Sequence, residues 1–202
     1  MADTPLSPQD ERTIARAHPL ARRLVERLRR GRQGRVLDFA AGNGRNGAAL
    51  RAAGFTVVSI DDARAGSQAP LAGLTGRFAA VVTTHGLLHG SPGAIEARLD
   101  AIAEAMHGSG LLYATFGSSR DARFGKGECL GATTFAPHDG DERGVAHTYF
   151  DRDGLEALLQ RRFSVESLEE HAVDDAAGTW AHEERALAGA VHWFAVVSKL
   201  PS

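Results

Sequence analysis

The chain has 202 residues, of which 43% are hydrophobic and 24% are charged, which suits one folded domain with a sizeable core. Its formal net charge of −2 gives the whole molecule no attraction for nucleic acid or for an anionic membrane, so neither is an expected partner. No apolar run is long enough to cross a bilayer, and the first residues lack the pattern of a secretory signal. Cys129 is the single cysteine, which excludes an intrachain disulfide, and we therefore expect a cytoplasmic protein.

Residues 1–34 predict a helical cap. Ser7 followed by Pro8 is typical of a helix start, and Pro19 should interrupt that helix. A second helical stretch then has leucines at i, i+4 spacing and ends at Gly31. These leucines are Leu20, Leu24 and Leu28. We interpret the arginines between them as a solvated face, because a nucleic-acid patch would also need interleaved aromatic residues.

The remaining residues, 35–202, alternate strand and helix patterns at first. Residues 35–61 predict a strand, a glycine-rich turn, a helix and a second strand, and residues 78–83 predict the next strand. The segment between them, 62–77, is too short and too rich in Gly, Ala and Pro for a full helix plus another strand. A helix pattern from Pro92 closes near Gly108 or Gly110, and an apolar strand follows at 111–116.

The last third contains two polar segments. Residues 117–146 are loop-like, and residues 169–190 form a second insertion, so we place insertions at about 117–150 and 171–190. Between these segments, residues 151–161 have a helical pattern and residues 163–168 predict a strand. A buried final strand is predicted at 191–197, and the short connection favours an antiparallel hairpin.

The turn after the first strand matches G-x-G-x-x-G from Gly42 to Gly47, and an acidic residue, Asp61, ends the second strand. Glycines let the backbone approach a ligand closely, and Asp61 can accept hydrogen bonds from a ribose diol. Both features serve any ligand with an adenosine-like ribose. Asp38 separates the candidates, because its carboxylate would repel a pyrophosphate but attract an ammonium or a sulfonium. S-adenosylmethionine fits all three features, and an NAD(P)-dependent oxidoreductase using the GNGRNG loop is the alternative.

On these residues the chain resembles the class I, Rossmann-like S-adenosylmethionine-dependent methyltransferases. Residues 38–46 are similar to their first motif, with Ala40 in place of its first glycine, and Asp61 matches the acid after their second strand. The resemblance implies an α/β three-layer sandwich whose mostly parallel sheet ends in an antiparallel hairpin, here shortened between strands two and four. It looks closest to small-molecule enzymes of the tellurite- or thiopurine-methylating type.

The resemblance also implies S-adenosylmethionine as cofactor, a small-molecule substrate, and a set of cofactor-binding residues. That set is Asp38, Ala40, Gly42, Asn43, Gly44, Arg45, Asn46, Asp61, Asp62, Thr84 and His85. The chain departs from the family at 62–77, where family members have a helix and a third strand. A non-catalytic protein of this fold that binds ligands is therefore a third hypothesis.

The substrate side is predicted to come from the N-terminal helix and the two insertions, where His and aromatic residues gather. The lining candidates are Arg120, Arg123, His147, Tyr149, Trp180 and His182, together with His85 and His192. No catalytic group is assigned. We expect no metal, because His85 and His89 have no third ligand nearby in sequence, and because the acidic turn 138–142 lacks the spacing of a calcium loop.

Overall fold

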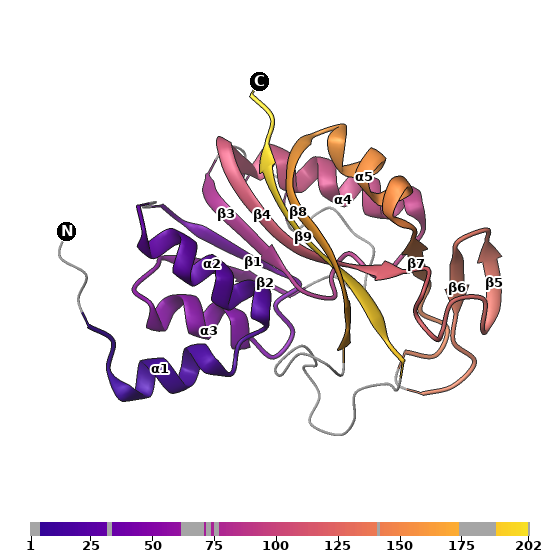
Figure 1. Ribbon diagram of the computed structural model, residues 1–202, viewed down its shortest axis with the longest axis horizontal. Coiled ribbons are helices and arrows are strands. Elements are labelled where there is room, and N and C mark those ends of the chain that lie inside the picture. Colours follow the sequence, from indigo (N-terminus) through magenta and orange to yellow (C-terminus); the bar gives the residue numbers. More distant parts are fainter. Residues whose placement is uncertain are drawn as a thin grey trace.

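The computed structural model describes residues 5–31, 34–61, 71, 74, 77–140, 142–173 and 189–201. Helices flank a mixed sheet on both sides, so the fold has three layers (Figure 1). The helices are α1 (Pro8–Ala15), α2 (Pro19–Arg29), α3 (Arg45–Ala52), α4 (Pro92–Ala105) and α5 (Arg152–Gln160). The first three lie together on one side, and α4 and α5 lie on the other (Figure 1).

The sheet is parallel through its first four strands and becomes antiparallel at the C-terminus. Its strands are β1 (Val36–Phe39), β2 (Val57–Ile60), β3 (Phe78–Thr83), β4 (Met106–Ser118), β5 (Glu128–Gly131), β6 (Thr134–Ala136), β7 (His147–Phe150), β8 (Phe163–Ala172) and β9 (Val191–Lys199). Parallel pairing runs β2-β1-β3-β4, and β9 then pairs antiparallel with both β4 and β8. The predicted α/β fold with a closing antiparallel hairpin is confirmed.

Alternate residues of the buried strands face the two helical layers, as the pleat of a strand requires. On β3, Val81 belongs to the core packed under α4 and α5, whereas Ala80 and Val82 belong to the core under α2 and α3. Both faces of the central sheet are therefore buried, which explains why its strands read as continuous apolar runs rather than as alternating patterns.

The N-terminal helices form as predicted. Ser7 and Asp10 make a reciprocal capping box at the start of α1, and the chain leaves the helix before Pro19. The leucine face of α2 is buried, and Arg23 pairs with Glu169 of β8 through two nitrogen–oxygen contacts of 3.0 Å. Helix α2 is thus anchored to the end of the sheet as well as to its face.

Three predicted boundaries are wrong. Helix α4 ends at Ala105, and strand β4 starts directly at Met106, well before the predicted start of that strand at 111. Residues 117–146 are not one loop, because β5 and β6 form a hairpin that extends the sheet through β7 (Figure 1). Strand β8 continues to Ala172, into the second predicted insertion, whose residues 174–188 lie outside the described ranges.

Strand β3 is the next described strand after β2, and most of the connection predicted to be short, 62–77, lies outside the described residues. Strand β1 lies between β2 and β3, so the order of the sheet reverses at β1. Ligands of open α/β sheets bind at the carboxyl ends of strands where the order reverses. By this rule, a ligand of this protein would bind at the loop after β1.

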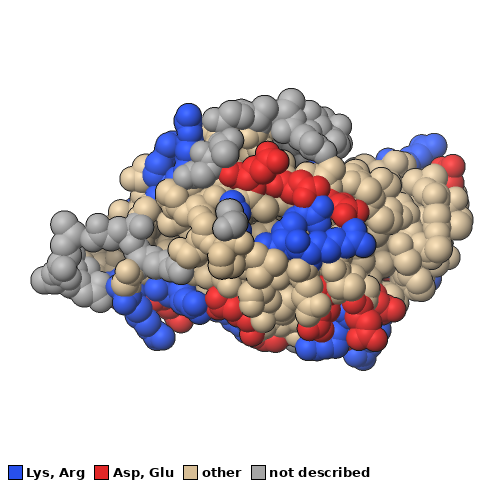
Figure 2. Space-filling model, turned by 90° about the horizontal axis from the view of Figure 1, so that it is seen from above, with Lys and Arg blue, Asp and Glu red and all other residues tan. Residues whose placement is uncertain are grey.

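Acidic and basic side chains lie next to each other on the face seen from above (Figure 2). Ion pairs between α4 and the end of α5 are of this kind: Arg161 contacts Glu96, and Arg162 contacts both Glu96 and Asp100. In the part of the chain that the structure describes, no helix is both long and apolar enough to span a membrane.

Candidate cofactor site

The loop between β1 and α3 turns through three residues with positive φ. Ala40 has a φ of 57°, Gly42 of 52° and Gly44 of 76°, and Gly44 is the N-cap of α3. Glycine adopts this region freely, whereas an alanine there is strained. Ala40 occupies the position of the first motif glycine, so the loop keeps the left-handed turn even without that glycine.

Asp38 lies under this loop and is fully buried. Its Oδ2 accepts a hydrogen bond of 2.8 Å from the backbone N–H of Gly47 in the first turn of α3, and its Oδ1 has no partner among the described residues. Burial raises the pKa of Asp38 to about 6, against the opposing effects of the Gly47 amide and of Arg51. The first role of this carboxylate is thus to hold the start of α3, and only Oδ1 is left for a ligand.

Asp61 connects the end of β2 to the same loop. One of its carboxylate oxygens, Oδ1, accepts from the backbone N–H of Gly42 at 3.1 Å, and the N–H of Ala41 donates to the carbonyl of Ile60 at 3.0 Å. Asp61 is exposed, in contrast to Asp38. The two carboxylates therefore flank the loop as the sequence predicted, one beneath it and one at its open side.

The side chain of Asn46 makes two hydrogen bonds within the protein. Its buried side chain accepts from the backbone N–H of His18 at 3.0 Å and donates to Thr84 Oγ1 at 2.9 Å. Asn46 and Thr84 therefore join α2, α3 and the end of β3. The exposed Asn43 accepts instead from the backbone N–H of Arg45 at 3.2 Å. Burial lowers the pKa of Arg45, and the charge of nearby Arg22 lowers it further.

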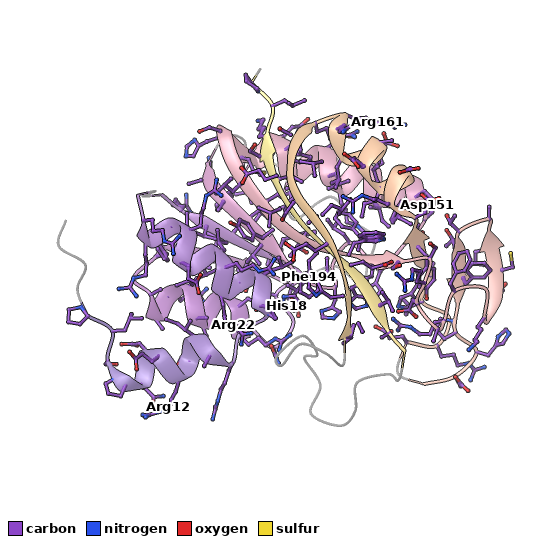
Figure 3. All side chains as sticks on the ribbon, in the orientation of Figure 1. Arg12, His18, Arg22, Asp151, Arg161 and Phe194 are labelled. Atoms are coloured by element: carbon purple, nitrogen blue, oxygen red, sulfur yellow. The ribbon has the colours of Figure 1, made fainter. Side chains whose placement is uncertain are left out.

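Three histidine rings gather beside the loop. The ring centroid of His85, which follows β3, lies 6.1 Å from that of His18 and 5.4 Å from that of His192 on β9. His18 is also the N-cap of α2, where its Nδ1 accepts from the N–H of Leu20 at 3.1 Å, and its ring lies 5.0 Å from that of Phe194 (Figure 3). Because Nδ1 accepts, the neutral ring of His18 carries its proton on Nε2.

The histidine cluster of His18, His85 and His192 is held in the neutral form. Burial is the main cause that lowers the pKa of all three, to about 3 for His192 and well below the usual range for the others. His18 Nε2 and both ring nitrogens of His192 have no hydrogen-bond partner among the described residues. Buried polar atoms of native proteins are normally satisfied, so these nitrogens mark a place where a polar ligand would bind. Sequence reasoning missed His18, since a histidine before a proline is not a typical capping signal.

The predicted substrate-lining residues separate into two places. Arg120 is exposed and pairs with Glu170 of β8 at 2.7 Å. Arg123, His147 and Tyr149 lie together: the ring centroids of His147 and Tyr149 are 6.5 Å apart and the rings are stacked, and burial raises the pKa of Tyr149 to about 12. The predictions for Asp62, Trp180 and His182 fall outside the described residues.

No protein-family model matches the sequence, and no curated protein is significantly similar to it. Solved structures do match over almost the whole chain. The 1,6-didemethyltoxoflavin N1-methyltransferase of Burkholderia thailandensis, solved with 1,6-didemethyltoxoflavin and S-adenosylhomocysteine, is 20% identical with a TM-score of 0.62, over 98% of this chain and 93% of that one.

Two further structures agree. An S-adenosylmethionine-dependent methyltransferase of Methanosarcina mazei is 16% identical with a TM-score of 0.57, over 85% of this chain and 95% of its own. A glycopeptide N-methyltransferase complexed with S-adenosylmethionine is 16% identical with a TM-score of 0.53, over 92% and 95% of the two chains. The chain therefore has the fold of Rossmann-like S-adenosylmethionine-dependent methyltransferases.

Proposed function

We propose that this protein transfers a methyl group from S-adenosylmethionine to a small molecule. The observation that carries the proposal is the position of Asp38 and Asp61, which flank the loop after β1 at the carboxyl edge of the sheet. Asp61 would bind the ribose diol, and Oδ1 of Asp38 would attract the ammonium or the sulfonium. The fold shared with solved methyltransferases supports the same conclusion.

The same geometry argues against a dinucleotide. A pyrophosphate binds at the N-terminus of the helix after the glycine loop, where it accepts from free backbone N–H groups. Here the N–H of Gly47 already donates to Asp38, and this buried carboxylate stands where the negative charge of a pyrophosphate would come close. We therefore attribute the G-x-G-x-x-G match to the positive φ angles of this turn rather than to dinucleotide binding.

On the acceptor side, the histidine cluster supplies neutral imidazoles next to the cofactor loop. Methyl transfer from a sulfonium is an in-line displacement, which depends mainly on alignment and exclusion of water. The N–H of His18 Nε2 is available to donate a hydrogen bond to the acceptor. His192 is available as donor or acceptor according to its tautomer. We propose that these two residues orient a polar acceptor through hydrogen bonds, because neutral imidazoles themselves carry no charge to pair with an ion.

Two kinds of acceptor atom are considered, a chalcogen and a nitrogen. The sequence resemblance to tellurite- or thiopurine-methylating enzymes favours a chalcogen acceptor, whereas the Burkholderia enzyme methylates a ring nitrogen. A heteroaromatic nitrogen fits the hydrogen-bonding capacity of His18 and His192 better. A substrate panel with matched thiol and nitrogen heterocycles separates the two kinds.

Calorimetry with S-adenosylhomocysteine tests the cofactor proposal. We expect binding by the wild type, weakening by at least tenfold in Asp61→Ala, and unchanged binding in the control Glu11→Ala, which alters an exposed carboxylate on α1. A wild type that unfolds cooperatively but binds no S-adenosylhomocysteine would refute the proposal. Binding without turnover of any acceptor in the panel would instead favour the non-catalytic hypothesis.

A further inference from the structure

A second group of titratable side chains, His89, Glu142 and His147, lies near the histidine cluster and has no role in the methyl transfer proposed above. His89 and His147 form an isolated antiparallel bridge between the segment after β3 and the start of β7. Backbone hydrogen bonds on both sides of the bridge, Gly90 N–H to Ala146 at 2.7 Å and Thr148 N–H to Leu88 at 3.0 Å, fix the two chains. Directly opposed residues of such a bridge project their side chains from the same face, so the two imidazoles meet.

Glu142, which lies in the turn before β7, contacts both imidazoles. Its Oε1 lies 3.2 Å from His89 Nε2, and its Oε2 lies 3.1 Å from His147 Nε2. The side chain of His147 is 2% exposed and that of His89 is 14% exposed, whereas that of Glu142 is 33% exposed. The three donor atoms lie within 4.8 Å of one another, with the carboxylate on the solvent side.

The hydrogen bond made by Nδ1 of His147 determines whether its Nε2 carries a proton. His147 Nδ1 lies 2.8 Å from the carbonyl of Val145, and since a carbonyl only accepts, Nδ1 carries a proton. In the neutral ring Nε2 is then a lone pair that faces a carboxylate oxygen, which also only accepts. The contact is favourable only if a proton or a metal ion lies between the two atoms. An imidazole fixed by a backbone carbonyl on its outer nitrogen is the usual arrangement of a metal-ligating histidine.

The local charge also favours a cation. Arg123 makes a two-point contact with Asp121, at 3.0 Å and 3.2 Å, and lies 3.5 Å from Glu142 Oε2. This group thus has two carboxylates, those of Asp121 and Glu142, for the one guanidinium of Arg123.

We propose that His89, Glu142 and His147 bind one divalent transition-metal ion, with Zn²⁺ the favoured ion. Two histidines and one glutamate are an established zinc donor set, and the same donors also suit Fe²⁺. Tetrahedral bonds of about 2.0–2.1 Å place ligand atoms roughly 3.3 Å apart, close to the separations of His89 Nε2 from Oε1 (3.2 Å) and of His147 Nε2 from Oε2 (3.1 Å), so each imidazole faces its own oxygen of Glu142. The exposed side of Glu142 leaves room for water in the remaining position.

This proposal changes the sequence-based expectation of no metal. That expectation relied on the absence of a third ligand close to His89 in sequence, and the ligands instead come 53 and 58 residues later along the chain. Glu142 was also interpreted as part of a solvated turn, but it is partly buried between two imidazoles.

Equilibrium dialysis of untagged protein against Zn²⁺ tests the site, with every protein carrying Cys129→Ser to remove the exposed thiol as a competing ligand. We expect one equivalent bound by the parent protein, and at least about tenfold weaker binding in Glu142→Gln and in His89→Gln. His138→Gln is the matched control, because His138 is an exposed histidine near the same turn and outside the cluster. Co²⁺ should give visible ligand-field bands in the parent that both ligand variants lose.

Parallel arms identify the ion and exclude general electrostatic binding. Fe²⁺ under anaerobic conditions competing with Zn²⁺ at the same residues supports the proposal, whereas Mg²⁺, which prefers oxygen donors, should not compete. Thermal unfolding of each variant without metal shows whether it folds. The proposal is overturned if the folded parent binds no Zn²⁺, if Glu142→Gln and His89→Gln bind as tightly as His138→Gln, or if Mg²⁺ competes equally. None of these readouts depends on methyl transfer.

Discussion

Asn46 donates a hydrogen bond of 2.9 Å to Thr84 Oγ1 across 38 residues of sequence. The same amide accepts from the N–H of His18, so one buried side chain connects the helix after the cofactor loop, the end of β3 and the start of α2. Each of these segments contributes to the candidate site. The relative position of the glycine loop and the histidine cluster therefore depends on Asn46.

Asn46→Ala should destabilise the fold by about 2–3 kcal/mol, because it leaves the buried N–H of His18 and the hydroxyl of Thr84 without their partner. Urea denaturation measures the change. Asn43→Ala is the control, since Asn43 is exposed and accepts from the N–H of Arg45 within the same loop, and its loss should cost about 1 kcal/mol or less. Equal losses in the two variants would contradict the linking role of Asn46.

Asp38→Asn should make the protein more stable and a weaker binder of the cofactor. The folded-state pKa of Asp38 is raised from 3.8 to about 6, so its ionised form is destabilising at neutral pH, by up to about 3 kcal/mol. An amide keeps an acceptor for the N–H of Gly47 without that charge. Urea denaturation at pH 8 should show higher stability, while calorimetry shows weaker binding of S-adenosylhomocysteine. Lower stability together with unchanged affinity would refute both roles.

Cofactor affinity should depend on pH through the same carboxyl group. An ammonium or a sulfonium prefers the ionised form, which is lost as the pH falls through about 6. We expect the affinity for S-adenosylhomocysteine to fall between pH 7 and pH 5 in the wild type and to stay nearly constant in Asp38→Asn. Parallel pH profiles in the two proteins would show that Asp38 is not the group responsible.

The histidine cluster should make the fold sensitive to acid. For His18, His85 and His192 the folded-state pKa is lowered, so their stabilising contribution is complete above the unfolded pKa of about 6.5 and is lost as the pH falls below it. Each contributes about 1.4 kcal/mol per pH unit in that range. Urea denaturation from pH 7 to pH 4 should show a slope in His192→Gln that is flatter than that of the wild type by about this amount. Identical slopes would mean that His192 is already charged in the folded protein.

Gly86→Ala should disturb the cofactor loop. A Cβ at Gly86 would lie 2.5 Å from both Ala40 Cβ and Thr83 Oγ1, so the loop or the end of β3 must move. We expect at least tenfold weaker binding of S-adenosylhomocysteine, measured by calorimetry. In the control Gly93→Ala the new methyl group meets nothing within 4 Å, and because Gly93 is helical this variant should gain up to about 1 kcal/mol with unchanged affinity.

The predicted strand, turn and helix around the loop are confirmed, because they depend on local sequence. The strand, turn and helix at 35–52 follow from apolar periodicity and glycines, and the two acidic residues at strand ends are brought to one edge by the parallel pairing of β1 and β2. The predicted roles of Asn46 and Thr84 as cofactor ligands did not anticipate that their side chains hydrogen-bond to each other. Sequence spacing does not show which way a polar side chain turns at a helix start.

The hairpin of β5 and β6 was not predicted from the sequence, because it depends on contacts with a distant strand. It lies within the polar, glycine-rich stretch 117–146, and it forms because β6 pairs with one edge of β7, whose other edge pairs with β4. Such pairing energy comes from contacts distant in sequence, which no local propensity records.

The sequence by itself determined the α/β fold, the glycine loop and the carboxylates Asp38 and Asp61, because each is encoded within a single strand–turn–helix unit and its following strand. Only the tertiary structure decided how these groups are used. It buried Asp38 so that one oxygen holds Gly47, it brought His18, His85 and His192 together from three distant segments, and it placed Glu142 between His89 and His147. The physical reason is that burial, pKa and ligand geometry depend on neighbours in space, and folding brings those neighbours from far along the chain.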